Sequence, residues 1–333
     1  MGVVLMDCTL RDGANVVGKG FSAEITDMIL DGLTACHVPI VEFGNAGGVG
    51  AYEVAGFTAA ETDQTYLDVA KKYLDRGSEL GMFMNAKRYR EKNVALAKES
   101  GLSFLRVGVD AGDGDIALPA IASIKKSGLK AYYSAMKAYL LTPNQLVEEA
   151  KKLEAAGLDE FTIMDSAGTM LPDRAAEYTT KLKAAVKIPV AFHCHNNLGL
   201  SAANAMAAYK SGADILDCGL MGMARSAGNL ATEICVAMMH RCGEMQEIDL
   251  YGILDFIEKR LQPAMEPYNY HNPISPLDLS LGLSGCHSSF VKKFKTIAAE
   301  KKVNLYKLIV AVSAIDQKAP SEELITQVAD SLD

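Results

Sequence analysis

Short apolar, β-type runs alternate with helical patterns from Val3 to about Cys242, and this alternation constrains the fold more than any other feature of the sequence. Strands separated by helices predict parallel βαβ units. Glycines follow several predicted helices, as at Gly101 and Gly157, where a left-handed residue can end a helix. No GxGxxG sequence follows the first predicted strand, which disfavours a dinucleotide-binding, doubly wound sheet. We therefore predict a (β/α)8 TIM barrel with a small helical C-terminal extension.

The predicted barrel has eight strands, each followed by a helix. The predicted strands are Val3–Met6, Pro39–Phe43, Gly81–Asn85, Phe104–Val109, Ala131–Ala135, Glu160–Met164, Pro189–His193 and Ile215–Cys218. The predicted helices are Ser22–Ala35, Thr65–Leu80, Tyr89–Ser100, Ala117–Ser127, Thr142–Ala156, Asp173–Val186, Gly199–Lys210 and Gly228–Met239.

The strand-helix alternation stops after about Arg241. A segment rich in Pro, Asn and Tyr runs from Pro263 to Pro276, and helical patterns surround it without further strands. The predicted helices of this region are Ile248–Leu261, Ser288–Lys301, Asn304–Ala314 and Ser321–Ser331. We predict that residues 1–245 form a catalytic TIM barrel with a divalent-metal site and that residues 246–333 form a helical extension near the barrel mouth.

Composition excludes several classes of partner. A net charge of -8 without basic runs argues against nucleic acid and anionic membranes and fits a small-molecule substrate. No apolar run approaches the length of a membrane-spanning helix, and no signal peptide is recognisable. The seven cysteines, an odd number scattered through predicted strands and helices, indicate reduced thiols and a cytoplasmic location.

Two histidines at the end of the seventh predicted strand are candidate metal ligands. Because side chains alternate along a strand, His193 and His195 should project to the same side. Buried, hydrogen-bonded core histidines are the competing interpretation. Asp12 favours the metal site, because it follows the first strand and strand ends meet at one face of a barrel. Asp, His and His with water or substrate oxygens suit Mn²⁺ or Mg²⁺, and Zn²⁺ also fits these ligand types.

Three sequence blocks stand at predicted strand ends: TLRDG after the first strand, HCHNNLGLSAAN at the seventh and AGNLATE after the eighth. Together they resemble the DRE-TIM metallolyase superfamily, which includes hydroxymethylglutaryl-CoA lyase. Three further blocks, MDSAGTMLPD, VEFGNAGGVG and LGLSGCHSSF, resemble the 4-hydroxy-2-oxovalerate aldolase branch in the same order. The resemblance covers nearly the whole chain.

The resemblance implies roles for individual residues. It makes Asp12, His193 and His195 the metal ligands, with Asn229 as a fourth ligand or, alternatively, a residue at a helix N-terminus. Ser166 would contact the carboxylate end of the substrate.

The implied reaction is cleavage or formation of a 4-hydroxy-2-oxo acid, giving pyruvate and an aldehyde. A divalent ion would act as a Lewis acid, and Arg11 would add positive charge where the enolate develops.

The sequence departs from the aldolase pattern at three positions. Asn15 stands where the family has a histidine that serves as general base, and an amide cannot accept a proton near neutral pH. His287 stands where the aldolase has a tyrosine, and we predict that this imidazole takes over acid-base catalysis; a buried structural histidine is the alternative. Asn45 replaces another histidine at a predicted substrate-binding position, so the changed groups predict an altered substrate.

Other functions remain open at this point. A Claisen-type enzyme that condenses an acyl-CoA with a 2-oxo acid belongs to the same superfamily, although Ala14-Asn15 replaces the Glu of its TLRDGEQ motif. The acyl-CoA lyase is disfavoured, because its cysteine-containing loop is shortened here. Lys137 and Lys87 follow predicted strands and would suit a Schiff-base aldolase. A non-catalytic paralogue would bind metal and a 2-oxo acid without turnover.

The resemblance also suggests protein partners. Aldolases of this branch often pair with an acylating aldehyde dehydrogenase, which makes such an enzyme a candidate partner. A homo-oligomer is the other candidate assembly.

Overall fold

Eight parallel strands form a closed barrel in which each strand pairs with the next and the eighth pairs with the first. The computed structural model describes residues 2–270, 275–284, 286, 290–316 and 319–332. The strands are β1 (Val4–Asp7), β2 (Ile40–Phe43), β3 (Glu79–Asn85), β4 (Phe104–Asp110), β5 (Lys130–Met136), β6 (Glu160–Asp165), β7 (Val190–Cys194) and β8 (Ile215–Cys218). The prediction of a (β/α)8 barrel is confirmed.

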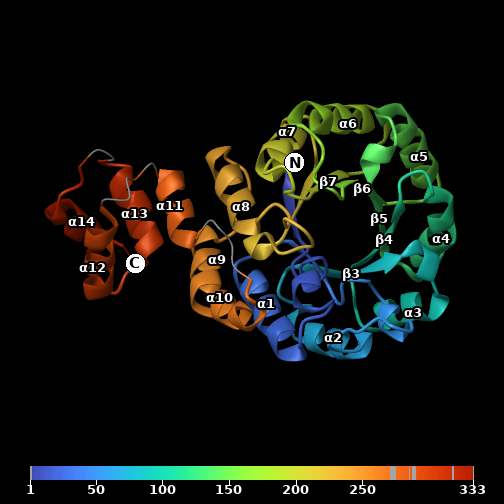
Figure 1. Ribbon diagram of the computed structural model, residues 1–333, viewed down its shortest axis with the longest axis horizontal. Helices are drawn as coiled ribbons and strands as arrows, with labels where there is room; N and C mark the ends of the chain where they lie inside the picture. The colour runs from blue at the N-terminus through green and yellow to red at the C-terminus, as the bar shows by residue number, and fades with distance from the viewer. Residues whose placement is uncertain (1, 271–274, 285, 287–289, 317–318, 333) are drawn as a thin grey trace. The chain divides into compact units, whose positions relative to one another are not determined.

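A helix follows each strand, and the helices surround the strands as a ring (Figure 1). These helices are α1 (Ala23–Ala35), α2 (Asp63–Ala70), α3 (Glu91–Glu99), α4 (Leu118–Ser127), α5 (Pro143–Ala155), α6 (Pro172–Ala185), α7 (Ser201–Lys210) and α8 (Thr232–Arg241). Local signals set several of their ends. Thr142 and Gln145 form a reciprocal capping box at the start of α5, and Gly128 adopts a φ of 83° at the end of α4.

Two predicted helix boundaries were wrong. The helix predicted over Thr65–Leu80 ends at Ala70 in a short 3-10 turn, because β3 already begins at Glu79, whose N–H donates to the Pro39 carbonyl. The helix predicted from Gly228 begins instead at Thr232. Backbone hydrogen bonds to the ends of β7 and β8 hold the intervening residues in a loop.

The interior of the barrel has an apolar layer below a polar one. Buried apolar side chains pack together below the polar layer; they are Met6, Ile40, Phe104, Tyr132, Ala191 and Ile215, and Cys8, which follows β1, joins this cluster. Two residues further along their strands, on the same face, lie buried polar side chains: Glu42, Arg106, Ser134, His193 and Asp217. Side-chain alternation along the strands therefore places a charged layer between the apolar layer and the carboxyl ends of the strands.

The chain divides into two compact units, Met1–Ile248 and Asp249–Asp333. In the described part of the second unit all regular elements are helical: α9 (Leu250–Phe256), a π-helical turn (Ile257–Leu261), α10 (Gln262–Met265), a 3-10 turn (Glu266–Tyr268), α11 (Pro276–Ser284), α12 (Val291–Lys301), α13 (Leu305–Ser313) and α14 (Glu322–Ala329). Its core includes Phe294, Leu308, Val312 and Ile325. No helix that the structure describes has the length and apolar character needed to cross a membrane.

Candidate metal centre and cavity

Asp12, His193 and His195 converge where β1 and β7 end. His193 lies within β7 and His195 follows it, so both imidazoles turn to the same side, as strand alternation predicts. Their Nε2 atoms lie 3.5 Å and 3.6 Å from Asp12 Oδ2. A turn after β1 places Asp12, whose backbone N–H donates to the Cys8 carbonyl at 2.8 Å. The three residues are at most 8% exposed and offer ligand atoms that all lie within 4.8 Å of one another.

Asn229 lies beside this group rather than at a helix N-terminus. The loop between β8 and α8 forms an isolated bridge between Asn229 and His195, which brings the amide to the end of β7. Asn229 Nδ2 donates to Asp12 Oδ2 at 2.9 Å. Asn229 Oδ1 is buried and has no hydrogen-bond partner within the described residues. Because buried polar atoms are rarely left unpaired, this oxygen is a candidate for a ligand that the protein itself does not supply.

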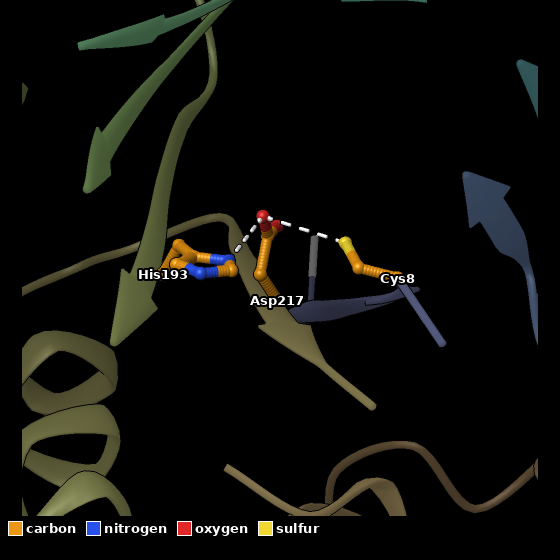
Figure 2. A group of neighbouring side chains, drawn as sticks. All are labelled: Cys8, His193 and Asp217. Atoms are coloured by element: carbon orange, nitrogen blue, oxygen red, sulfur yellow. Dashed lines mark hydrogen bonds and ion pairs between the residues drawn. The ribbon is translucent and has the colours of Figure 1, made fainter. Parts of the chain in front are cut away.

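Asp217 orients His193 from below. Its Oδ2 lies 3.2 Å from His193 Nδ1, and Figure 2 shows the carboxylate between His193 and Cys8. Burial alone would raise the pKa of Asp217, but Arg106 and His193 outweigh it and lower the pKa to about 2. The carboxylate is therefore ionised and accepts the Nδ1 proton. This leaves His193 Nε2 to face Asp12, an arrangement that carboxylates commonly impose on metal-binding histidines.

Cys8, His193 and Asp217 form a second group with closely spaced ligand atoms. The guanidinium of Arg106 already contacts this group. Arg106 Nη1 lies 2.5 Å from Asp217 Oδ2, and Arg106 Nη2 donates to Cys8 Sγ at 3.2 Å. Burial raises the pKa of the Cys8 thiol well above its usual range. A metal ion here would face a fixed guanidinium and a neutral thiol, so this group positions His193 instead of forming a second metal site.

Glu42 connects two buried arginines below the cavity. Its carboxylate accepts from Arg106 Nη2 at 2.7 Å and from Arg11 Nε at 2.6 Å. Burial alone would raise the pKa of Glu42, but the two guanidinium groups lower it. Arg11 Nη1 also lies 3.2 Å from Asp12 Oδ1, while Arg11 Nη2 has no partner among the described residues. Arg11 is thus fixed on one side and keeps a donor for a ligand.

The donor set fits a divalent cation. It offers one carboxylate, two imidazoles and an unpartnered amide oxygen, which are ligand types of Mn²⁺, Mg²⁺ and Zn²⁺ sites. Burial alone would raise the pKa of Asp12, but Arg11 and both histidines outweigh it and hold it well below its usual range. Burial would lower the pKa of His193, yet hydrogen bonds to Asp12 and Asp217 raise it. A bound cation must displace that proton, so metal affinity should fall as pH falls.

A cavity of about 690 Å³ opens above this centre. Its wall contains four of the predicted site residues: Arg11, Asp12, Ser166 and His195. The other lining residues are Lys19, Ala46, Gly47, Phe57, Phe83, Asn85, Arg88, Asp110, Met136, Lys137, Arg225 and Ser226. A cavity of this size accommodates a small organic ligand.

Asn15, which stands where the resemblance implies a general base, is held by hydrogen bonds. Its Nδ2 donates to the Asp12 carbonyl at 2.8 Å and to Asp12 Oδ1 at 3.3 Å, while its Oδ1 accepts from Arg225 Nε at 2.9 Å. Ser166 Oγ accepts from the Lys137 N–H at 2.9 Å, which leaves its hydroxyl proton for another acceptor. Asn15 therefore braces Asp12, and Ser166 presents a donor on the cavity wall.

One predicted site residue, Asn45, does not join this group. Asn45 is fully buried and is not among the residues that line the cavity. Its Nδ2 donates to Asp63 Oδ1 at 3.1 Å and its Oδ1 accepts from the Gly47 N–H at 2.9 Å, so the amide holds the loop after β2. His287 lies outside the described residues.

The family model described as HMGL-like matches residues 2–258 of this chain. A relative from Carboxydothermus hydrogenoformans named 4-hydroxy-2-oxovalerate aldolase is 32% identical over 325 residues, which cover 98% of this chain and 96% of the relative. A relative of the same name from Pectobacterium atrosepticum is 32% identical and covers 99% and 95% of the two chains. These matches confirm the predicted superfamily and its aldolase branch.

A solved structure of similar fold supports the architecture. The HMG-CoA lyase of Bacillus subtilis superimposes with a TM-score of 0.66 at 20% identity, and the match covers 82% of this chain and 95% of the lyase. At this identity the likeness concerns the barrel fold alone.

Proposed function

Because this chain belongs to the HMGL-like family, we propose that it is a divalent-metal-dependent aldolase that cleaves or forms a 4-hydroxy-2-oxo acid, yielding pyruvate and an aldehyde. One observation carries the proposal. Asp12, His193 and His195 converge at the carboxyl ends of the strands, next to a cavity that Arg11, Asp12 and His195 line, in a chain about one-third identical to aldolases over nearly its full length.

Asp12, His193 and His195 would hold the cation, with Asn229 Oδ1 as a further ligand. When bound, the ion supplies Lewis-acid polarisation of a 2-oxo acid. Mn²⁺ and Mg²⁺ suit the carboxylate and amide oxygens, and Zn²⁺ suits the imidazoles.

Arg11 places a positive charge where the enolate oxygen develops. Glu42 and Asp12 fix its guanidinium, and its unpartnered Nη2 supplies a donor that needs no reorganisation during the reaction. Ser166 would donate its hydroxyl proton to the carboxylate of the substrate. Asn45 was predicted to bind substrate, but its buried amide holds the loop after β2. A direct contact between Asn45 and the substrate would require that loop to change conformation.

The base that removes the 4-hydroxyl proton must come from another residue than Asn15. His287 retains this role in our proposal, because an imidazole titrates near neutral pH. A Schiff-base mechanism is disfavoured: a nucleophilic lysine needs a lowered pKa, whereas its hydrogen bond to Asp110 raises the pKa of Lys137. Lys87 is paired with Asp113 at 3.3 Å.

The proposal extends to the domain organisation, cellular location and partners of the enzyme. Residues 1–245 would form the catalytic barrel, and residues 246–333 a helical extension near its mouth. The protein would work in the cytoplasm, as a homo-oligomer or with an acylating aldehyde dehydrogenase.

The test is metal-dependent release of pyruvate from a panel of 4-hydroxy-2-oxo acids, with chelator and Mn²⁺ add-back. We expect turnover to disappear with chelator and to return with Mn²⁺. A Claisen-type condensing enzyme would instead consume acyl-CoA together with a 2-oxo acid. Tight Mn²⁺ binding without turnover in either assay would support a non-catalytic binding protein.

A further inference from the structure

Five cationic side chains line the cavity, and three of them form no ion pair within the described part of the chain. Arg11 is paired with Glu42 at 2.6 Å, and Lys137 with Asp110 at 2.8 Å. The other three lie on the loops that follow β1, β3 and β8; they are Lys19, Arg88 and Arg225.

Among the described residues, these three cations contact neutral groups. Lys19 Nζ lies 4.9 Å from the centroid of the Phe57 ring. Arg88 donates to a backbone carbonyl of the loop after β2, and its buried Nε has no hydrogen-bond partner in the described part of the chain. Arg225 Nε donates to the amide oxygen of Asn15. Burial lowers the pKa of Arg88, which shows that its charge is partly desolvated and not compensated. A bound anion would offset this cost.

The charged groups at the metal centre are paired with one another. Arg11 pairs with Glu42 and Asp12, and Arg106 pairs with Glu42 and Asp217. Among the described residues, the three cations of the cavity wall take no part in these ion pairs, so they remain available to a second anionic group.

We propose that the aldehyde half of the substrate carries its own anionic group, a carboxylate or a phosphate, and that Arg88 binds it together with Lys19 and Arg225. This rests on the proposed aldolase function and names its substrate class. The cavity of about 690 Å³ has room for a substituent beyond pyruvate and a two-carbon aldehyde. Charge-assisted contacts from arginine suit both oxyanions.

The test compares three aldehydes in metal-dependent condensation with pyruvate: succinic semialdehyde, glycolaldehyde phosphate and propanal. We expect kcat/KM for at least one anionic aldehyde to exceed that for propanal by about tenfold or more, the effect of one or two charge-assisted hydrogen bonds. Preference for one of the two anionic aldehydes identifies carboxylate or phosphate as the group. Equal or better use of propanal would overturn the proposal.

Arg88→Gln keeps a similar shape but removes the charge. It should lower the anionic-to-neutral ratio of kcat/KM by about tenfold to a hundredfold. The matched control is Lys87→Gln, which removes a neighbouring charge that is paired with Asp113 and does not line the cavity. This control should leave the ratio unchanged. An equal loss for all three aldehydes in Arg88→Gln would contradict anion recognition.

Two further measurements separate this inference from the aldolase function. Metal-dependent deuterium exchange at the pyruvate methyl group tests enolate formation without any aldehyde. Exchange without a preference for anionic aldehydes would retain the aldolase and reject the anion site. A ³¹P NMR titration of the Mg²⁺-loaded full chain with inorganic phosphate tests the site without turnover. Binding weakened by Arg88→Gln but not by Lys87→Gln supports it, and binding that Arg88→Gln leaves unchanged rejects it.

Discussion

Asp217→Asn should weaken metal binding without removing any metal ligand. The substitution retains an oxygen that can accept from His193 Nδ1, but it removes the charge that fixes the ring and raises the electron density at Nε2. Loss of such a supporting carboxylate typically reduces metal affinity about tenfold to a hundredfold, or about 1.4–2.7 kcal/mol. Arg106 also loses one of its two carboxylates. Breaking a buried ion pair costs about 3 kcal/mol or more, and Glu42 should keep the loss near the lower end.

Calorimetric titration with Mn²⁺ and thermal unfolding of the metal-free protein measure the two effects separately. Glu160→Gln is the matched control, because Glu160 is also a buried barrel carboxyl. Burial raises its pKa well above the usual range, so it is protonated, and its Oε1 accepts from Thr162 instead of contacting His193. The control should retain wild-type Mn²⁺ affinity. Unchanged affinity in Asp217→Asn, with the expected loss of stability, would refute the orienting role of Asp217.

Three further predictions follow from individual side chains. Burial raises the pKa of Asp7 from 3.8 to about 6, so ionisation of this carboxyl destabilises the fold as pH rises through that range. Asp7→Asn can still form a hydrogen bond with the Thr232 hydroxyl and should stabilise the protein at pH 8 by up to about 3 kcal/mol. Urea unfolding should show this gain at pH 8 and its disappearance below pH 4. His287→Ala should lower kcat about 10²-fold to 10⁴-fold while Mn²⁺ affinity stays constant, and full turnover would reject its role as base. Arg11→Lys should lower kcat about 10²-fold to 10³-fold in steady-state kinetics, because an ammonium group cannot bond Glu42 and the enolate oxygen in the same fork geometry; an unchanged kcat would argue against enolate stabilisation.

The barrel could be predicted because its signals are local. Each strand is a short apolar run, and glycines or capping residues end the neighbouring helices. The helix predicted over Thr65–Leu80 failed for a tertiary reason. Its pattern continues past Ala70, but pairing of β3 with the start of β2 requires extended backbone from Glu79 onward. A helical pattern contains no information about the strand that must follow it.

The metal ligands could be predicted from topology, but their supports were missed. Asp12, His193 and His195 stand at strand ends, which meet at one face of a barrel. Glu42, Arg106 and Asp217 stand inside apolar strands, and the sequence analysis did not single them out. A charged residue within a buried run is itself a signal, because it must find a partner in the core. Lys19, Arg88 and Arg225 could not be predicted in this way, since they come from three loops with no common spacing.

The buried network below the cavity is better explained by positioning than by stability. Apolar side chains of similar volume could fill the same layer at little or no cost in folding free energy, because desolvation offsets most of the attraction between buried charges. Apolar side chains, however, cannot fix the orientation of a neighbouring guanidinium or imidazole group. Glu42 holds Arg11, Arg106 joins Glu42 to Asp217, and Asp217 holds His193. One continuous set of ion pairs thus sets the orientation of both the enolate-facing guanidinium and a metal-binding imidazole, which come from opposite ends of the barrel sequence.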